Sequence, residues 1–328
     1  MKTMRALVFR QYGPPSVVSV GEVDRPAVGP NDVLVRNEAS IISAAETAAR
    51  SGSPFVARLY FGLRRPKWSV LGNNFAGTVE QIGTGVTRFA VGDRVAGLTP
   101  SDKFGAHAEY VCVAESGAII ERPAGMSTAD AAALFDGGLT ALPFVRDGAQ
   151  LRAGQRVLIN GASGAVGTAA VQLARHFGAH VTAVCSAGNH DLVTQLGADE
   201  VIDYTTADFT QARGRYDVIV DAVGKSTYRR CRASLTARGI YLTTVPTLAI
   251  MMQMLVTTRF TKRTARIVFA GLRKPSAMAD DLATLAALAA DGVLVPVIDR
   301  VFTVHEGAQA HAYVDTQRKR GSAVITFA

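Results

Sequence analysis

Two patterns of apolar and polar positions follow each other along the chain. Up to about residue 122, short apolar runs are separated by Gly and Pro residues, which is typical of strands in a small antiparallel domain. The runs that predict strands in this part are Ala6–Phe9, Asp32–Arg36, Gly77–Ile82, Arg94–Ala96 and Ala108–Val113. We therefore expect the first part of the chain to be a mostly antiparallel β domain.

From Ser127 onward, continuous apolar runs alternate with segments of helical periodicity. The helical segments begin near Ser127 and end at Phe177, Leu196 and about Leu235. The runs that predict strands are Arg156–Asn160, His180–Cys185, Glu200–Tyr204, Tyr216–Val220, Gly239–Val245 and Arg266–Ala270. This alternation predicts a parallel sheet with helices on both faces.

The end of the chain returns to short strands. After a helical segment at Asp280–Ala290, the runs Val295–Asp299 and Ala323–Phe327 are expected to rejoin the first domain. The sequence thus predicts an α/β protein with a β domain at 1–126, a doubly wound parallel sheet at 127–272 and a return segment at 273–328.

The strongest chemical signal is a glycine-rich turn that follows the strand ending at Asn160 and opens a helix. Such a turn lets the backbone approach a pyrophosphate, and the helix N-terminus offers free N–H groups and a positive dipole end. The turn predicts a dinucleotide site with these cofactor-binding residues: Gly161, Ser163, Gly164, Ala165, Val166 and Gly167.

The end of the second strand bears on which nicotinamide cofactor is bound. NAD-preferring folds carry an Asp or Glu there for the ribose 2′-hydroxyl. This chain has Ser186 and Asn189 instead, and its first carboxylate after the strand is Asp191. Tyr204, at the end of the third strand, is either a further contact to a 2′-phosphate or a half-buried aromatic residue. The pattern favours NADPH over NADH.

Composition and charge exclude several classes of function. The chain is 48% hydrophobic and 19% charged, which is enough to form a buried core. The net charge of +8 is scattered along the chain, so we expect no nucleic-acid partner. The longest apolar stretch, around Leu248–Val256, is shorter than the ~20 residues of a membrane helix, and the first residues lack the pattern of a signal peptide. We expect a cytoplasmic protein with no membrane partner, and three widely spaced cysteines predict no disulfide framework.

Several motifs in order along the chain resemble those of zinc-independent medium-chain dehydrogenase/reductases of the quinone-oxidoreductase type. The matching segments are Glu46-Thr47, Leu71–Gly77, Gly92-Asp93, Gly138-Leu139-Thr140-Ala141, the glycine turn, Leu196–Asp199, Ile202–Tyr204, Asp221–Gly224 and Gly321–Ile325. The resemblance implies a chaperonin-10-like β domain beside a Rossmann domain, bound NADPH and a homodimer. It also implies substrates that are quinones, enones or other small apolar conjugated carbonyl compounds.

The positions that carry zinc ligands in the metal-dependent branch differ in this chain. They hold Ser43 and Asn73, and neither residue competes with thiolate and imidazole for zinc. His107 has no nearby second ligand in the sequence and is interpreted as a packed or surface histidine. We expect no metal site.

The resemblance also implies the remaining site residues. Thr140 is expected beside the nicotinamide, and the dinucleotide track is expected to include Gly224, Thr244, Val245 and Ala270. Ser43 stands where many relatives have Asn, and Ala48 stands where they often have an aromatic residue. Tyr60 is then either a substitute proton donor or a packing residue.

Four further features stay open at this stage. Asn74 replaces the Asp of close relatives, and Asp136 is either an acid near the substrate or a solvated loop charge. Arg320 either reaches the 2′-phosphate or belongs to a surface cluster. The Met-rich segment Leu248–Val256 packs in the core or a dimer contact, or it forms a substrate wall.

Without a metal, negative charge that forms during hydride transfer must be held elsewhere, and a conjugated carbonyl delocalises it onto its own oxygen. The sequence therefore predicts a metal-free NADPH-dependent reductase of quinones or enones. Two alternatives remain open: a zinc-free, NADP-dependent alcohol dehydrogenase or ketone reductase, and a non-catalytic NADPH-binding redox sensor.

Overall fold

A computed structural model describes residues 2–100 and 103–327, and it divides the chain into two compact units. Unit 1 extends up to Asp136 and also takes in Lys274–Ala290 and the chain from Pro296 onward. Unit 2 consists of Gly137–Arg273 and Asp291–Val295. The first division falls inside helix α3 (Thr128–Pro143) rather than in the loop before it, because the helix continues unbroken through the end of unit 1.

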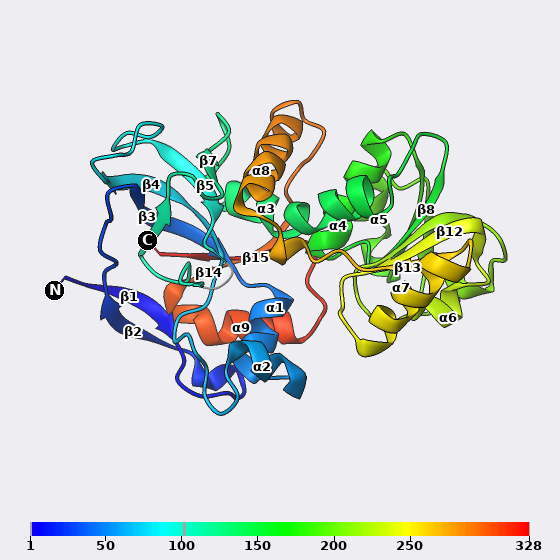
Figure 1. The fold of residues 1–328 in the computed structure, drawn as a ribbon, viewed down its shortest axis with the longest axis horizontal. Coiled ribbons are helices and arrows are strands. Elements are labelled where there is room, and N and C mark those ends of the chain that lie inside the picture. The colour runs from blue at the N-terminus through cyan, green and yellow to red at the C-terminus, as the bar shows by residue number, and fades with distance from the viewer. Residues whose placement is uncertain (1, 101–102, 328) are drawn as a thin grey trace. The chain divides into compact units, whose positions relative to one another are not determined.

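Unit 1 is built on two sheets, as Figure 1 shows. A two-stranded ribbon pairs β1 and β2, and a seven-stranded sheet has the order β14-β15-β3-β4-β5-β7, with β6 paired to β3. All the pairings are antiparallel except that of β14 with β15. The strands are β1 (Thr3–Val8), β2 (Ser19–Asp24), β3 (Asp32–Ile41), β4 (Asn74–Ile82), β5 (Arg94–Leu98), β6 (Tyr110–Ala114), β7 (Ile119–Glu121), β14 (Ile298–Thr303) and β15 (Ser322–Thr326). The last two strands join the sheet of unit 1 as expected, because β14 pairs with β15 and β15 with β3. The strand expected at Val295–Asp299 is instead Ile298–Thr303, and Asp291–Val295 belong to unit 2.

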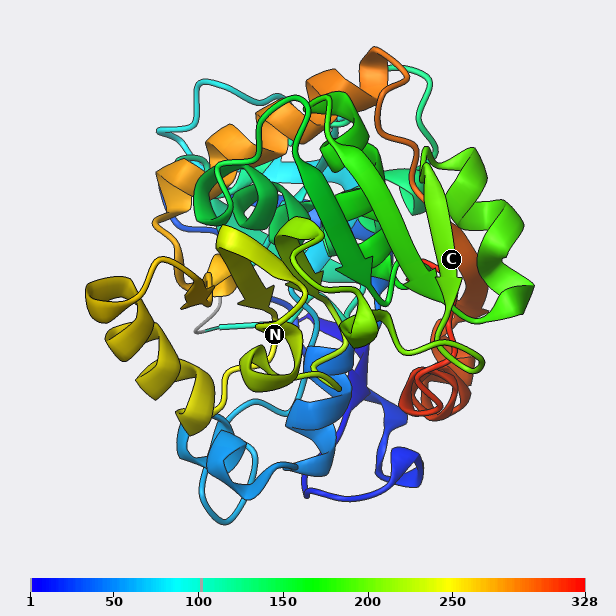
Figure 2. The same ribbon diagram turned by 90° about the vertical axis from the view of Figure 1, so that its right-hand side faces the viewer.

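Unit 2 contains a six-stranded parallel sheet, whose strands lie side by side in Figure 2. The order is β10-β9-β8-β11-β12-β13, so the direction of winding reverses between β8 and β11. The strands are β8 (Arg156–Asn160), β9 (His180–Cys185), β10 (Glu200–Asp203), β11 (Tyr216–Asp221), β12 (Leu235–Thr243) and β13 (Thr264–Arg266). In doubly wound sheets, ligands bind beyond the carboxyl ends of the strands at such a reversal point. The predicted Rossmann-type sheet and antiparallel β domain are confirmed.

Helices cover both faces of the unit 2 sheet, with α4 and α5 on one side and α6 and α7 on the other (Figure 1). The helices of the chain are α1 (Ala44–Ser51), α2 (Arg58–Phe61), α3, α4 (Ala165–His176), α5 (His190–Gln195), α6 (Tyr228–Cys231), α7 (Leu248–Phe260), α8 (Pro275–Ala290) and α9 (Gly307–Asp315). No helix in the described part of the chain is both long and apolar enough to cross a bilayer.

Two sequence-based element boundaries in unit 2 are wrong. The helix expected to reach about Leu235 ends at Cys231, and β12 already begins at Leu235, which pairs with Tyr216 of β11. The strand expected at Arg266–Ala270 is instead Thr264–Arg266, held by pairing with β12 and by the Ala265 N–H, which donates to Thr257 Oγ1. In both cases a partner strand distant in sequence sets the boundary.

Candidate functional site

The glycine turn lies at the carboxyl end of β8 in unit 2, next to the point where the sheet reverses. Gly161 has φ +80°, and a Cβ there would lie 2.2 Å from Val223 Cγ2. A Cβ at Gly167 would lie 2.1 Å from the Gly161 carbonyl oxygen, so this position permits the close packing of α4 on the turn. Gly164 is the N-cap of α4 and no side chain caps the helix, which leaves the N–H groups of its first turn for an anion.

A second glycine brings helix α3 against the same turn. A Cβ at Gly137 would lie 1.9 Å from the Ala165 carbonyl oxygen, so only glycine lets α3 pass this close to the start of α4. Thr140 follows one turn later on α3 and is half-buried. The structure therefore places Thr140 in unit 2, on the helix that touches the glycine turn.

Asp221 organises the neighbouring loop at the end of β11 and was not among the expected site residues. It is fully buried, and its two carboxylate oxygens accept hydrogen bonds from a side chain on β8, a side chain on β12 and three loop N–H groups. The donors are Asn160 Nδ2, the Val223 and Gly224 N–H groups, the Ser226 N–H and the Tyr241 hydroxyl. Burial together with the Asp221 charge raises the pKa of Tyr241, so this hydroxyl remains a donor. Asp221 thus fixes the loop that carries Gly224, which itself has φ +75°.

The remaining expected track residues also lie beyond the carboxyl ends of the unit 2 strands. Thr244 and Val245 follow β12, and their backbone N–H groups donate to the Asp221 carbonyl oxygen and to Thr243 Oγ1. Val245 is 39% exposed. Ala270 opens a 3-10 turn after β13.

The structure brings together the uncharged residues expected near a 2′-phosphate. Asn189 Nδ2 lies 3.2 Å from both Ser163 Oγ and Ser186 Oγ, so one amide joins the glycine turn to the end of β9. Tyr204 is 61% exposed beside this group, with its N–H donating to the Cys185 carbonyl, and the half-buried interpretation is wrong.

The same end of the sheet holds two residues that sequence reasoning passed over. His190 begins α5, and its Nε2 is buried with no hydrogen-bond partner in the described part of the chain. Asp203 ends β10, and hydrogen bonds from the Thr205 N–H and hydroxyl lower the pKa of its carboxyl. This carboxylate is thus occupied by donors of its own loop.

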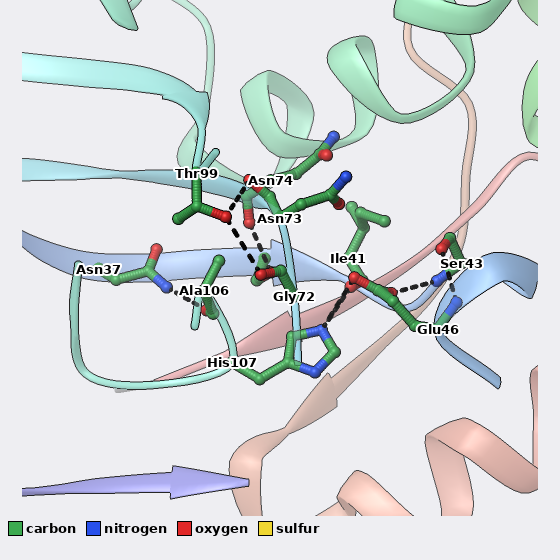
Figure 3. Close-up of polar contacts among 11 residues, drawn as sticks. Asn37, Ile41, Ser43, Glu46, Gly72, Asn73, Asn74, Thr99, Ala106 and His107 are labelled. Atoms are coloured by element: carbon green, nitrogen blue, oxygen red, sulfur yellow. Dashed lines mark hydrogen bonds and ion pairs between the residues drawn. The ribbon is translucent and has the colours of Figure 1, made fainter. Parts of the chain in front are cut away.

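In unit 1, the residues at the expected substrate side form one buried polar cluster, drawn in Figure 3. Ser43 is the N-cap of α1, and its Oγ accepts from the Glu46 N–H while the Glu46 carboxyl accepts from the Ser43 N–H at 2.7 Å. This reciprocal capping box holds the Glu46 side chain at the helix start, where it is 2% exposed. The Ser-x-x-Glu spacing is visible in the sequence and would have singled out Glu46.

Burial makes the two titratable groups at the centre of this cluster neutral. It raises the pKa of Glu46 to about 8, with a further increase from the charge of Asp136. It also lowers the pKa of His107 to about 4. The His107 Nε2 lies 2.8 Å from the Ile41 carbonyl oxygen, so the ring carries its proton on Nε2 and donates it there. Glu46 Oε1 lies 3.7 Å from the same nitrogen, and this contact is not an ion pair at neutral pH because both groups are uncharged.

The Asn73–Asn74 pair lies at the start of β4, beside this cluster. A Cβ at Gly72, where φ is +86°, would lie 2.4 Å from His107 Cδ2, so the backbone and the histidine are in close contact. The Asn73 carbonyl oxygen accepts from the Thr99 N–H at 2.7 Å. Asn74 is buried, and its Nδ2 has no hydrogen-bond partner among the described residues. The pair therefore offers a neutral amide donor inside the protein.

Asp136 is tied into unit 1 rather than solvated. Its side chain is 8% exposed, its Oδ2 accepts from Ser322 Oγ at 2.8 Å, and Lys319 Nζ lies 3.7 Å away. The solvated-loop interpretation is therefore wrong, and Asp136 acts on the cluster through its effect on the pKa of Glu46.

Two other expected residues of unit 1 lie in different surroundings. Tyr60 is 42% exposed and packs on Phe61 and Trp68, with ring centroids 5.1 Å and 5.7 Å away. Arg320 lines an open cavity of about 650 Å³ on unit 1 together with Arg300 and Arg318. Its proposed contact with a 2′-phosphate stays a prediction.

Within residues 2–100 and 103–327, no three His, Cys, Asp or Glu side chains are grouped so that they could hold a metal ion. Cys112, Cys185 and Cys231 are free thiols, and burial raises the pKa of each to about 11. In the Met-rich helix α7, Ile250 is buried in the core of unit 2 and Met254 packs against that core, so the expected core packing holds for part of the segment. The exposed members of the segment are Leu248, Met251, Met252, Leu255 and Val256.

Comparisons with known proteins agree with this architecture. Residues 29–124 match the alcohol dehydrogenase GroES-like domain and residues 196–325 match the zinc-binding dehydrogenase family. The chain is 32% identical over 337 residues to a quinone oxidoreductase of Pseudomonas aeruginosa, covering 98% of this chain and 99% of that protein. It is 30% identical over 315 residues to a trans-enoyl reductase of Aspergillus terreus, covering 91% and 87% of the two chains. The solved quinone oxidoreductase of Coxiella burnetii superposes with a TM-score of 0.88 at 31% identity, and all of both chains is covered.

Proposed function

This chain belongs to the medium-chain dehydrogenase/reductase superfamily, in its quinone-oxidoreductase-like group, and on that premise we propose that it is a zinc-independent, NADPH-dependent reductase of quinones or other α,β-unsaturated carbonyl compounds. The family is one of oxidoreductases with a nicotinamide cofactor, which supplies a hydride when bound. The choice of NADPH, the zinc independence and the substrate class are the proposal.

The observation that carries the proposal is the buried cluster of unit 1, which holds neutral hydrogen-bond donors where a zinc enzyme needs ligands. Ser43 and Asn73 occupy the two ligand positions, and neither residue is a zinc ligand of useful affinity. The unpartnered amide Nδ2 of Asn74 and the protonated carboxyl of Glu46 are donors held without charge. Such donors suit an acceptor that spreads negative charge onto its own carbonyl oxygen, as quinones and enones do.

The residues of unit 2 fit a dinucleotide with a 2′-phosphate. The first turn of α4, which no side chain caps, would hold the pyrophosphate, and the loop fixed by Asp221 would flank it. Ser186 and Asn189 present no carboxylate to the ribose, and the exposed Tyr204 ring lies at the same end of the sheet. These features support NADPH over NADH.

We further propose that the chain forms a homodimer through unit 2. The supporting observations are an exposed apolar face on α7, where Leu248 and Phe260 are 77% and 78% exposed, and the position of β13 as the end strand of its sheet. Light scattering after size-exclusion chromatography tests this directly, and a mass of one chain at micromolar concentration would reject it.

The test of the reductase proposal is NADPH oxidation followed at about 340 nm. The chelator-treated protein is given quinones, linear enones, saturated ketones and alcohols, with Gly164→Asp as a variant that cannot hold phosphate beside the added carboxylate. We expect turnover of quinones or enones, undiminished by chelator and lost in the variant. Turnover of alcohols or saturated ketones alone would favour the zinc-free alcohol dehydrogenase, and NADPH binding without any turnover would favour the redox sensor.

A further inference from the structure

A short segment of unit 1, residues 55–68, exposes large apolar side chains that its own chain leaves uncovered. We call it the α2 lobe, because α2 forms its middle (Figure 1). Phe55, Leu59 and Leu63 recur every four residues and are 66%, 69% and 55% exposed. Isolated exposed apolar residues are common on proteins, but a group of three within nine residues marks a contact surface.

The same lobe carries exposed positive charge. Arg64, Arg65 and Lys67 follow directly on the apolar residues and are all exposed. The sequence has no Asp or Glu between Glu46 and Glu80, and no carboxylate of the described residues is paired with Arg64 or Arg65. Exposed cations without a carboxylate partner among the described residues also occur elsewhere, as at Arg213 and Arg238; in the lobe they lie beside exposed apolar side chains.

Aromatic packing fixes the position of the lobe on unit 1. Phe61, on α2, packs against the main core of unit 1, and its ring lies 6.3 Å from Trp68 and 5.9 Å from Phe104. Trp68 and Phe104 are themselves 5.0 Å apart. Phe61 therefore anchors the lobe to unit 1, while Phe55, Leu59 and Leu63 stay exposed.

We propose that the α2 lobe is a docking site for the surface of an anionic lipid bilayer. Apolar side chains beside exposed cations match the two components of such a surface, the acyl region and the negatively charged headgroups. A stable protein interface buries about 800 Å² on each partner and requires matched shape. A bilayer demands no matched shape, so a short lobe is sufficient.

This proposal departs from the sequence-based expectation of no membrane partner. That expectation rested on the lack of a spanning segment, whereas surface docking depends on which side chains are exposed, and only the folded chain shows this. The proposal goes beyond the reductase activity and does not require it, although docking would give access to apolar acceptors dissolved in the bilayer.

The test measures binding of the whole protein to vesicles, with Trp68 as a local probe because it is the only tryptophan in the chain. Vesicles of phosphatidylcholine are compared with vesicles that also contain phosphatidylglycerol, and quenching of Trp68 by lipids brominated on the acyl chain reports contact by the lobe itself. Each cation near an anionic surface contributes about 1 kcal/mol, or about fivefold in the partition coefficient. The variant Arg64→Gln/Arg65→Gln/Lys67→Gln should therefore bind on the order of a hundredfold more weakly.

A second variant and two matched controls distinguish docking by the lobe from nonspecific binding of any exposed cations or apolar side chains to vesicles. Phe55→Ser/Leu59→Ser/Leu63→Ser should abolish quenching of Trp68. The charge control, in unit 2, replaces the exposed cations Arg213, Lys262 and Arg238 by Gln. The apolar control replaces exposed residues elsewhere by Ser, namely Val91, Leu272 and Val301. Both controls should bind as the unchanged protein does.

Three results would overturn the proposal. They are no binding to anionic vesicles, equal losses in the lobe variants and their controls, and binding without quenching of Trp68. If instead the lobe variants abolish self-association in the absence of lipid, the occupant is a second copy of the chain and the lipid proposal is wrong. Turnover of a water-soluble quinone is measured separately, so failure of docking and failure of the reductase proposal are distinguishable.

Discussion

Replacing Glu46 by Gln should remove a pH-dependent loss of stability from unit 1. The carboxyl is 2% exposed, and burial raises its pKa from 4.5 to about 8. The native state therefore binds this proton more tightly than the unfolded state does. Stability from this group is fully present below about pH 4.5 and is lost as the pH rises toward 8, because the buried group must then ionise. Gln cannot ionise, and its amide oxygen can still accept from the Ser43 N–H.

The size of the effect follows from the two pKa values. One pKa unit corresponds to about 1.4 kcal/mol, and integration between pH 5 and pH 9 gives a loss of about 4 kcal/mol for the unchanged protein relative to Glu46→Gln. Urea unfolding followed by the fluorescence of Trp68 measures it, since this single tryptophan lies in the same unit. Between pH 5 and pH 9, the unfolding free energy of Glu46→Gln should rise relative to that of the unchanged protein by about this amount.

The chain contains a matched control in a second capping box. Glu306 accepts from the Thr303 N–H in the same motif, but at the surface, where that hydrogen bond lowers the pKa of its carboxyl. Glu306 is ionised in both folded and unfolded protein above pH 5, so Glu306→Gln should leave the slope of stability against pH unchanged. If Glu46→Gln also leaves that slope unchanged, Glu46 is ionised in the folded protein and the reasoning from burial is refuted.

Three further predictions concern the cofactor loops and His107. Asp221→Asn should weaken NADPH binding by about tenfold to a hundredfold, because the loop loses about one to three kcal/mol of hydrogen bonds. Nucleotide fluorescence measures the binding, and Asp217→Asn, at the other end of β11, should leave it unchanged. Gly164→Asp should raise the melting temperature, since Asp caps a helix better than Gly does by a few tenths of a kcal/mol. The same variant should not bind NADPH, because the added carboxylate repels the phosphates. Tight binding of NADPH by this variant would rule out a phosphate site at α4. His107→Gln should make the protein less sensitive to acid. Burial lowers the pKa of His107 from 6.5 to about 4, so the unchanged protein loses about 3 kcal/mol of stability as the pH falls through this range. Identical acid unfolding of both proteins would contradict this.

The sequence predicted the parts of the fold that depend on neighbouring residues. The strand His180–Cys185 is β9 as expected, and the motif Gly161–Gly167 forms the turn after β8 and the first residues of α4. These features follow from local apolar runs and from the conformational freedom of glycine, and both depend only on residues adjacent in the sequence. Where a boundary depended on a distant strand, as at Leu235, the local pattern was misleading.

For the candidate site, the sequence supplied residue types and only part of their roles. Ser43, Ser186 and Asn189 were recognised by position, but the importance of Asp221 and Glu46 was not. Five donors from separate segments converge on Asp221, and no single segment contains them.

The sequence by itself determined the alternation of strands and helices, the glycine turn and the absence of ligand types at the zinc positions. Only the tertiary structure decided that Glu46 and His107 are neutral, that Asp136 is enclosed and that the α2 lobe is exposed. The physical reason is that desolvation and exposure depend on all the atoms that surround a side chain. Those atoms come from segments as far apart as Ile41 and His107, which meet only when the chain has folded.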